Sequence, residues 1–131
     1  MSEKNKQVVR AYVDAFNRCD LDALTKLFTS DALIYGVLGW GAVEIAKPIW
    51  KELNECLNAN LQVEAIIAEE NIVAVRYTER GKSVQSFRGS RVTGKSYEVV
   101  AMEWFEMKDG LIHRRWGARD WSTMAKQMEL S

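Results

Sequence analysis

Hydrophobic residues recur at helical spacing in the first half of the chain and alternate with polar residues in the second half. An apolar stripe predicts an amphipathic helix over residues 3–18, because charged side chains lie largely off that stripe. A second stripe predicts a helix over residues 42–57. The first stripe contains Val9, Tyr12, Val13 and Phe16, and the second contains Val43, Ala46, Ile49, Trp50, Leu53 and Leu57.

Two features mark the segment between these helices. Asp20 precedes "LDALTKLF" and is placed to cap a short helix. The run "ALIYGVLGW" predicts a strand that enters a glycine-punctuated loop from Gly36 to Gly41. Pro48 lies inside the later helix, where a proline is expected to kink the helix or to begin a new segment.

From residue 61 onward the pattern is that of strands. Two runs meet at Glu70-Asn71, and two more meet at Asp109-Gly110, a strong hairpin-turn pair. "STMAKQMEL" has the spacing of a last short helix. The order predicts an α+β fold in which helices cover one face of a mostly antiparallel sheet that curves into a cone, with an open mouth suited to a small ligand.

Composition narrows the function. The 131 residues favour one domain over residues 1–131, with 47% hydrophobic and 27% charged residues and a net charge of +0. We therefore expect no nucleic-acid or membrane partner and a cytoplasmic protein. Cys19 and Cys56 are expected to be free thiols, and with His113 they form no zinc-ligand pattern. No phosphate-binding or serine-hydrolase motif occurs, so we expect no metal and no cofactor.

Several segments, taken in order, carry a family resemblance. They are "YVDAFNRCDLDALTKLFTSDALIYG", "AVRYTERG", "FRGSRVTGKSY", "WFEMKDGLIHRRWGARDW" and "MAKQM". Together they resemble the SnoaL-like polyketide cyclases, a branch of the nuclear transport factor 2-like superfamily. The resemblance implies a cystatin-like α+β barrel, a homodimer formed through the sheet, and a general acid/base at Asp120. The chain departs from the family at Tyr35, where a histidine is common, and at Arg114-Arg115, where Glu-His is common.

Asp120 has two interpretations. As a carboxylate at the mouth of a partly apolar pocket, it would abstract a proton next to a carbonyl or activate a water. It also lies just before the last predicted helix, where aspartate is among the best N-caps.

Glu103 shares strand parity with apolar residues, and an acid on an apolar face is costly unless it is paired. Arg114, assigned to the inward face of the neighbouring strand with Trp116 and Asp120, is its predicted partner. This pair either polarises a ligand and orients Asp120 or is a buried salt bridge without contact to ligand.

Aromatic residues supply the rest of the predicted site. Tyr35 either donates a hydrogen bond to a developing oxyanion or is an ordinary strand aromatic. The five tryptophans have two interpretations. They either fill the core and a dimer interface or form a stacking wall for a flat ligand. The predicted substrate-binding wall consists of Trp50, Trp116, Phe105 and Phe16. Trp104 is expected to face outward, toward a partner subunit.

These features favour a cofactor-free enzyme that binds a compact, largely apolar carbonyl compound and catalyses an aldol cyclisation or an isomerisation. Two alternatives stay open. One is an epoxide hydrolase-like reaction in which an acid–arginine–acid set, Asp120, Arg114 and Glu103, positions a water. The other is a small-molecule-binding or dimerisation module without catalysis.

Overall fold

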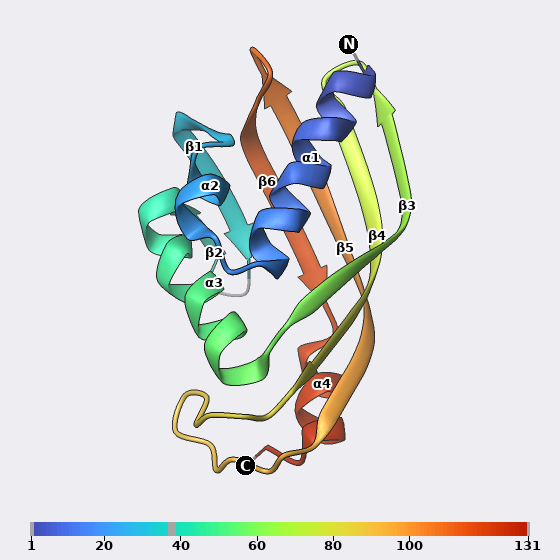
Figure 1. Ribbon diagram of the computed structural model, residues 1–131. Coiled ribbons are helices and arrows are strands. Elements are labelled where there is room, and N and C mark those ends of the chain that lie inside the picture. The colour runs from blue at the N-terminus through green and yellow to red at the C-terminus, as the bar shows by residue number, and fades with distance from the viewer. Residues whose placement is uncertain (1, 37–38, 131) are drawn as a thin grey trace.

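The chain folds into one open sheet of six strands with helices against its concave side (Figure 1). The computed structural model describes residues 2–36 and 39–130. Its elements are α1 (Ser2–Asn17), α2 (Leu21–Thr25), β1 (Phe28–Gly36), β2 (Gly39–Ala42), α3 (Val43–Leu57), β3 (Asn60–Glu69), β4 (Ile72–Lys82), β5 (Ser96–Lys108), β6 (Leu111–Arg119) and α4 (Trp121–Met128). The expected α+β class is confirmed.

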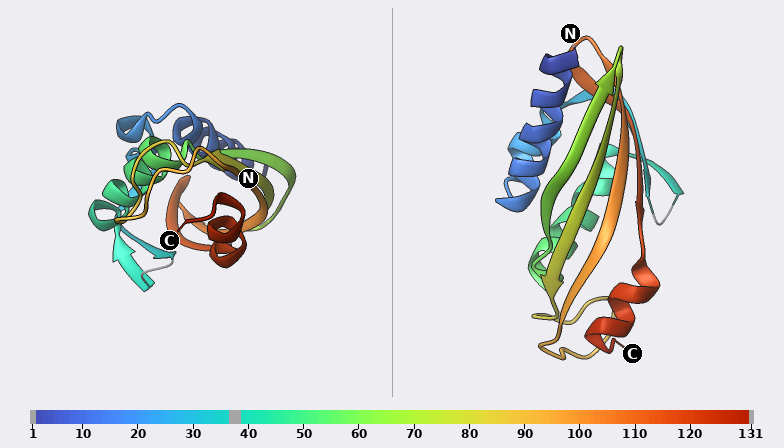
Figure 2. Two further views of the ribbon diagram at one scale, coloured as in Figure 1. Left: turned by 90° about the horizontal axis from the view of Figure 1, so that it is seen from below. Right: turned by 90° about the vertical axis from the view of Figure 1, so that its right-hand side faces the viewer.

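The strands are ordered β2-β1-β6-β5-β4-β3. All neighbours are antiparallel except β1 and β6, which run parallel because the chain crosses the whole sheet between them. The long strands curve around the helices, as the view along the sheet shows, and the two edge strands do not meet (Figure 2). The sheet is therefore a strongly curved cone that stays open and does not close into a barrel.

Local chemistry explains the helix limits. The Asp20 side chain accepts a hydrogen bond from the Ala23 amide at the start of α2, as expected of a cap. Pro48 does not begin a new helical segment, because α3 runs unbroken through it. Pro48 is only the sixth residue of α3, so it removes a single hydrogen bond near the helix start, and packing of the apolar face against the sheet outweighs that loss.

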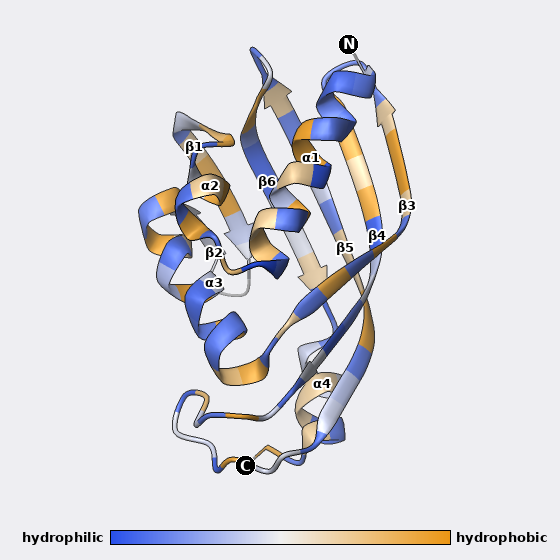
Figure 3. Cartoon of the chain, in the orientation of Figure 1, coloured by the Kyte–Doolittle hydropathy of each residue, from blue (hydrophilic) through white to orange (hydrophobic). Residues whose placement is uncertain are grey.

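The core lies between α1, α3 and the concave face of the sheet. Buried positions alternate with less buried ones along β4 and β5, and most of the buried ones belong to the core. Hydrophobic residues are frequent in β3 and β4 where these strands run beside α1 (Figure 3). Tyr12 of α1 is at the centre, with its ring edge-on to Phe28, Trp50 and Phe105 at centroid distances of 6.0, 6.3 and 5.2 Å. No helix in the described ranges is long and apolar enough to cross a membrane.

A β-bulge in β6 sets the orientation of the candidate site. Met107 pairs with Ile112 but Glu106 pairs with Arg114, so His113 is an extra residue in β6. Beyond the bulge the alternation is reversed, and Arg115 is buried while Arg114 and Trp116 are not. The expected inward face of this strand, extrapolated from Ile112, is therefore wrong from residue 114 onward.

Candidate functional site

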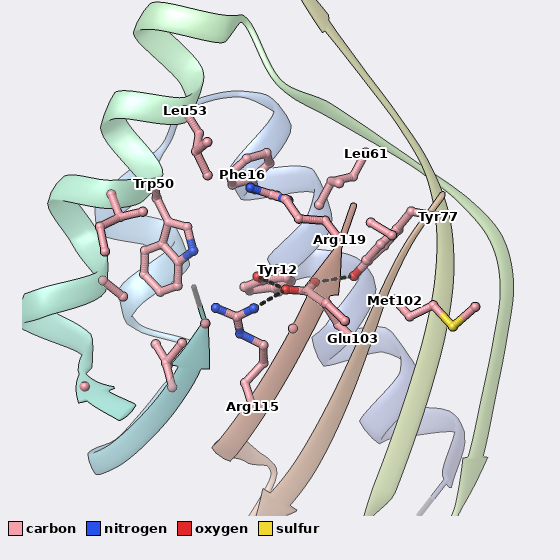
Figure 4. A pocket seen from close by; sticks show the side chains of 18 of the residues that line it. Tyr12, Phe16, Trp50, Leu53, Leu61, Tyr77, Met102, Glu103, Arg115 and Arg119 are labelled. Carbon is pink, nitrogen blue, oxygen red and sulfur yellow. Dashed lines mark hydrogen bonds and ion pairs between the residues drawn. The ribbon is translucent and has the colours of Figure 1, made fainter. Parts of the chain in front are cut away.

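A cavity of about 120 Å³ lies between α1, α3 and the concave face of the sheet, which is room for several waters or a small organic molecule. Its wall is mainly apolar (Figure 4). The apolar side chains that define it are Phe16, Ile34, Ile49, Trp50, Leu53 and Leu61. Trp40 and Ile45 also line it and are exposed, so they mark its rim.

One carboxylate on this wall, that of Glu103, accepts hydrogen bonds from three side chains. Glu103 of β5 accepts hydrogen bonds from the Tyr12 hydroxyl at 3.0 Å and from the Tyr77 hydroxyl at 2.8 Å. It also forms an ion pair with Arg115, whose Nη1 lies 2.6 Å from Oε2. Both charged side chains are about nine-tenths buried, at 10% and 11% exposure. The four side chains come from three strands and a helix and meet at one point of the cavity (Figure 4).

The two phenols are fixed in their protonated form. Burial, followed by the nearby Glu103 carboxylate, raises the pKa of Tyr12 and of Tyr77 well above the ordinary tyrosine value. Each hydroxyl therefore donates to Glu103 over the whole physiological pH range. Glu103 is held in place from both sides, which is the arrangement expected of a positioned acid/base group or of a structural ion pair.

Arg115 keeps donors that Glu103 does not use. One terminal nitrogen meets Glu103, and the other is directed toward the side of the cavity that Trp50 lines (Figure 4). The Trp50 ring nitrogen is turned toward the cavity interior (Figure 4). Gly117, two residues along β6, makes the Arg115 position possible, because a Cβ at residue 117 would overlap Arg115 Nη1.

A second acid–arginine pair lies next to the first. Glu79 of β4 is fully buried and accepts a hydrogen bond from the Tyr97 hydroxyl at 2.6 Å. Arg119 Nε lies 3.0 Å from Glu79 Oε1, yet the N–H does not point at that oxygen, so Oε1 has no directed hydrogen bond. Burial raises the pKa of Glu79, and the charge of Arg119 works against that rise.

Comparison with known proteins places this geometry in a family. The profile of the SnoaL-like domain matches residues 9–115, most of the chain. The chain belongs to the SnoaL-like domain family. The resemblance inferred from the sequence segments is thereby confirmed. No curated protein matches the chain in sequence.

Solved structures of SnoaL-like and related proteins share the fold. AclR of Streptomyces galilaeus, described as a candidate hydroxylase, is 22% identical with a TM-score of 0.89 over 98% of both chains. A candidate polyketide cyclase of Xanthomonas campestris is 20% identical, with a TM-score of 0.89 over 97% of this chain and 98% of that one. An LEH-like epoxide hydrolase of M. tuberculosis is 15% identical, with a TM-score of 0.76 over 98% of this chain and 91% of that one.

In this SnoaL-like chain Asp120 is a helix cap. Its carboxylate accepts hydrogen bonds from the Thr123 amide at 3.0 Å and from the Thr123 hydroxyl at 2.5 Å. These bonds lower its pKa, and the group is fully exposed and absent from the cavity wall. The interpretation of Asp120 as the catalytic base is corrected, because its side chain turns back onto the first turn of α4.

Three other residues of the predicted site also lie outside the cavity wall. Tyr35 is 42% exposed and packs against Trp40 on the outer side of the sheet, so it is no donor to the cavity. Trp116 lines the same outer side, at 5.3 Å from the Trp40 ring centroid. Arg114 donates to the backbone oxygens of Asp31 and His113 and does not meet Glu103. Strand parity fails for Arg114 and Trp116 because of the bulge at His113.

Three of the predicted residues lie where the cavity is. Glu103, Trp50 and Phe16 line it, whereas Phe105 is fully buried behind the wall against Tyr12. The prediction missed Tyr12, Tyr77 and Arg115, the three donors to Glu103. Tyr12 was visible on the apolar stripe of the first helix, where a buried hydroxyl needs a partner. Nothing in the local sequence joins it to Glu103, 91 residues away.

Proposed function

We propose that the cavity binds a compact, largely apolar carbonyl compound and that Glu103 exchanges a proton with the carbon next to its carbonyl. The observation that carries this proposal is the Glu103 carboxylate, held by Tyr12, Tyr77 and Arg115 on the wall of an otherwise apolar cavity. Glu103 takes the role that the sequence interpretation gave to Asp120, and it has the burial and the ligand access that Asp120 lacks.

The reaction would begin with transfer of the carbon-bound proton to a Glu103 oxygen, while the electron pair of the C–H bond moves into an enolate. The spare donor of Arg115 and the Trp50 ring N–H are positioned to hold the enolate oxygen. The enolate then attacks a second carbonyl within the same molecule, which closes a ring, and the resulting alkoxide takes the proton back from Glu103. If the enolate is conjugated with a double bond, it can instead take the proton from Glu103 at the far end of the conjugated system, which is an isomerisation. Neither outcome needs a redox cofactor.

The hydrogen bonds to Glu103 leave one of its oxygens better placed to receive a proton. Oε2 accepts hydrogen bonds from Tyr12 and Arg115, whereas Oε1 accepts one from Tyr77 only. Catalysis would also depend on stabilisation of the enolate by Arg115 in a site from which most water is excluded. We expect substrates whose enolates form readily.

Solvent deuterium exchange tests the proposal without knowledge of the natural substrate. A panel of aromatic ketones is incubated with the protein in D2O, and loss of the proton signal next to the carbonyl is followed by NMR. We expect the wild-type protein to accelerate exchange for at least one ketone that binds, and Glu103→Gln to lose the acceleration while still binding. Exchange at the uncatalysed rate with every bound ketone would refute the proposal.

Epoxide hydrolysis is the second candidate. It is favoured by the two adjacent acid–arginine pairs, Glu103–Arg115 and Glu79–Arg119, which differ from the Asp120–Arg114–Glu103 set inferred from the sequence. In that reaction Glu103 would take a proton from water as the water attacks the epoxide carbon and the C–O bond to that carbon breaks. The alkoxide would form beside Arg115 and take the proton back from Glu103, which gives the diol. Diol formation from an aryl epoxide distinguishes it from ketone chemistry. Binding without either reaction would leave a ligand-binding module.

We also propose that the outer side of the sheet forms a homodimer interface. Large apolar side chains are exposed there and line a groove across β3, β4, β5 and β6: Ile67, Met102 and Trp104, with Trp116 half-buried beside them. An apolar surface of this kind on one side of a sheet is typical of protein interfaces. Trp104→Asp is expected to yield monomers in sedimentation experiments while ligand binding in the cavity is unchanged. A wild-type protein that is monomeric at micromolar concentration would contradict this.

A further inference from the structure

Arg119 contributes a cation to the cavity wall that the proposed proton transfer does not use. Its side chain extends from β6 into the cavity that Phe16 and Leu53 also line (Figure 4). Its only ionic contact among the described residues is the Nε–Oε1 approach to Glu79, and it donates no directed hydrogen bond there. The Arg119 side chain as a whole is 21% exposed and lines the cavity, so the planar fork of N–H groups at its end is open to a ligand.

The described side chains that line the cavity carry two cations and one anion. Arg115 and Arg119 are its cations, and Glu103 is its one anion among the residues that line it. Glu79, the carboxylate nearest Arg119, is fully buried behind the wall and is also held by Tyr97. A ligand in the cavity therefore contacts Glu103, whose charge is balanced by Arg115. Next to that pair it contacts Arg119, which has free donors.

We propose that Arg119 binds a carboxylate of the ligand, so that the cavity selects keto acids over the corresponding neutral esters and ketones. A carboxylate matches the guanidinium fork in shape and charge, because two parallel N–H groups can meet its two oxygens. The carboxylate end of the ligand lies at Arg119, and the carbonyl end reaches Arg115 and Glu103. This inference rests on the proposed binding of a carbonyl compound in the same cavity and names the class of that compound.

The Glu79–Tyr97 pair is the positioning element for this anchor. Glu79 Oε1 lies 3.0 Å from Arg119 Nε, and Tyr97 donates a hydrogen bond to the other oxygen of Glu79. This arrangement holds the stem of Arg119 and leaves the terminal nitrogens unoccupied.

The test compares 3-benzoylpropanoate with its methyl ester, two ligands that share an aromatic ketone and differ in one charge. Dissociation constants are measured by calorimetry for the wild-type protein and for Arg119→Gln, with Arg114→Gln as the control because Arg114 lies on the same strand but faces outward. We expect the wild-type protein and the control to bind the acid about tenfold or more tightly than the ester. Arg119→Gln should bring that ratio to about one.

A second variant covers the risk that Arg119→Gln leaves the Glu79 charge unpaired and the protein unfolded. Glu79→Gln combined with Arg119→Gln removes both charges and preserves a partner for the Tyr97 hydroxyl. The double variant should fold and bind acid and ester equally. Equal affinities in the wild-type protein, no binding of the acid at millimolar concentration, or a preference for the acid that survives in the double variant would overturn the proposal.

The outcome is separate from that of the Glu103 experiment. If the ester undergoes catalysed deuterium exchange but binds as tightly as the acid, Glu103 has its proposed role and Arg119 is not a carboxylate anchor. If the acid binds through Arg119 but neither ligand exchanges, the anchor is present and the proton transfer is refuted.

Discussion

Two carboxylates near the same part of the sheet, Glu103 of β5 and Asp120 directly after β6, have opposite surroundings. Glu103 is buried on the cavity wall and accepts three hydrogen bonds from side chains that are remote in sequence. Asp120 is exposed, and both of its hydrogen bonds come from Thr123, three residues away. Local contacts of the second kind end a strand and start a helix, whereas a convergence of remote groups on a buried charge is typical of a functional site. The difference supports the proposal that Glu103 carries the chemistry, whereas Asp120 caps α4.

The largest expected difference between substitutions at Glu103 and at Asp120 is in the free energy of unfolding. Glu103→Ala leaves Arg115 buried without its counter-charge and leaves the Tyr12 and Tyr77 hydroxyls without an acceptor. Loss of one partner from a buried ion pair costs about 3–5 kcal/mol of unfolding free energy. Urea denaturation measures this loss. A loss no larger than that of Asp120→Ala would show that the cluster around Glu103 is solvated.

The next effect concerns the position of Arg115. Gly117→Ala places a methyl group where Arg115 Nη1 lies, so the guanidinium must move away from Glu103. We expect a loss of about 1–3 kcal/mol, as for other overpacked sites, together with a loss of ligand binding. Gly36→Ala is the matched control, because Gly36 also lines the cavity and a Cβ there meets no atom within 4 Å. Equal behaviour of the two variants would argue against a defined Arg115 position.

The smallest effect is expected at Asp120. Its pKa is lowered by the hydrogen bonds from Thr123, so the cap stabilises the fold at neutral pH and loses its effect as pH falls below the ordinary aspartate range of about 4. Asp120→Ala should therefore lower the melting temperature modestly at pH 7 and by less at pH 3, and Asp120→Ser should restore most of it. A difference that grows toward low pH would contradict the cap.

The contrast between Glu103 and Asp120 also explains what the sequence could predict. The helices, the two hairpins, the Asp20 cap and the order of elements follow from short-range patterns, and the structure reproduces them. Glu103 can be identified from the sequence because an acid on the apolar side of a strand is unusual. The sequence places its partner one residue too early, at Arg114, since the bulge at His113 shifts the side chains of β6 and has no clear signature in "LIHRRWG".

Long-range convergence is the part that sequence patterns do not encode. Tyr12, Tyr77 and Arg115 reach Glu103 from separations of 91, 26 and 12 residues. Sheet curvature and helix packing decide which of these side chains meet. Tyr35 and Trp116 lie on the outer side of the sheet, where their rings contact Trp40. They therefore cannot contact a ligand in the cavity.

Deuterium exchange with one bound ketone, measured side by side for Glu103→Gln and Asp120→Asn, tests the assignment most directly. Each substitution removes one carboxylate and keeps a side chain of similar size and hydrogen-bonding shape. We expect Asp120→Asn to retain the wild-type exchange rate and Glu103→Gln to fall to the uncatalysed rate. Loss of exchange in Asp120→Asn with full exchange in Glu103→Gln would contradict the assignment and return the catalytic role to the end of β6.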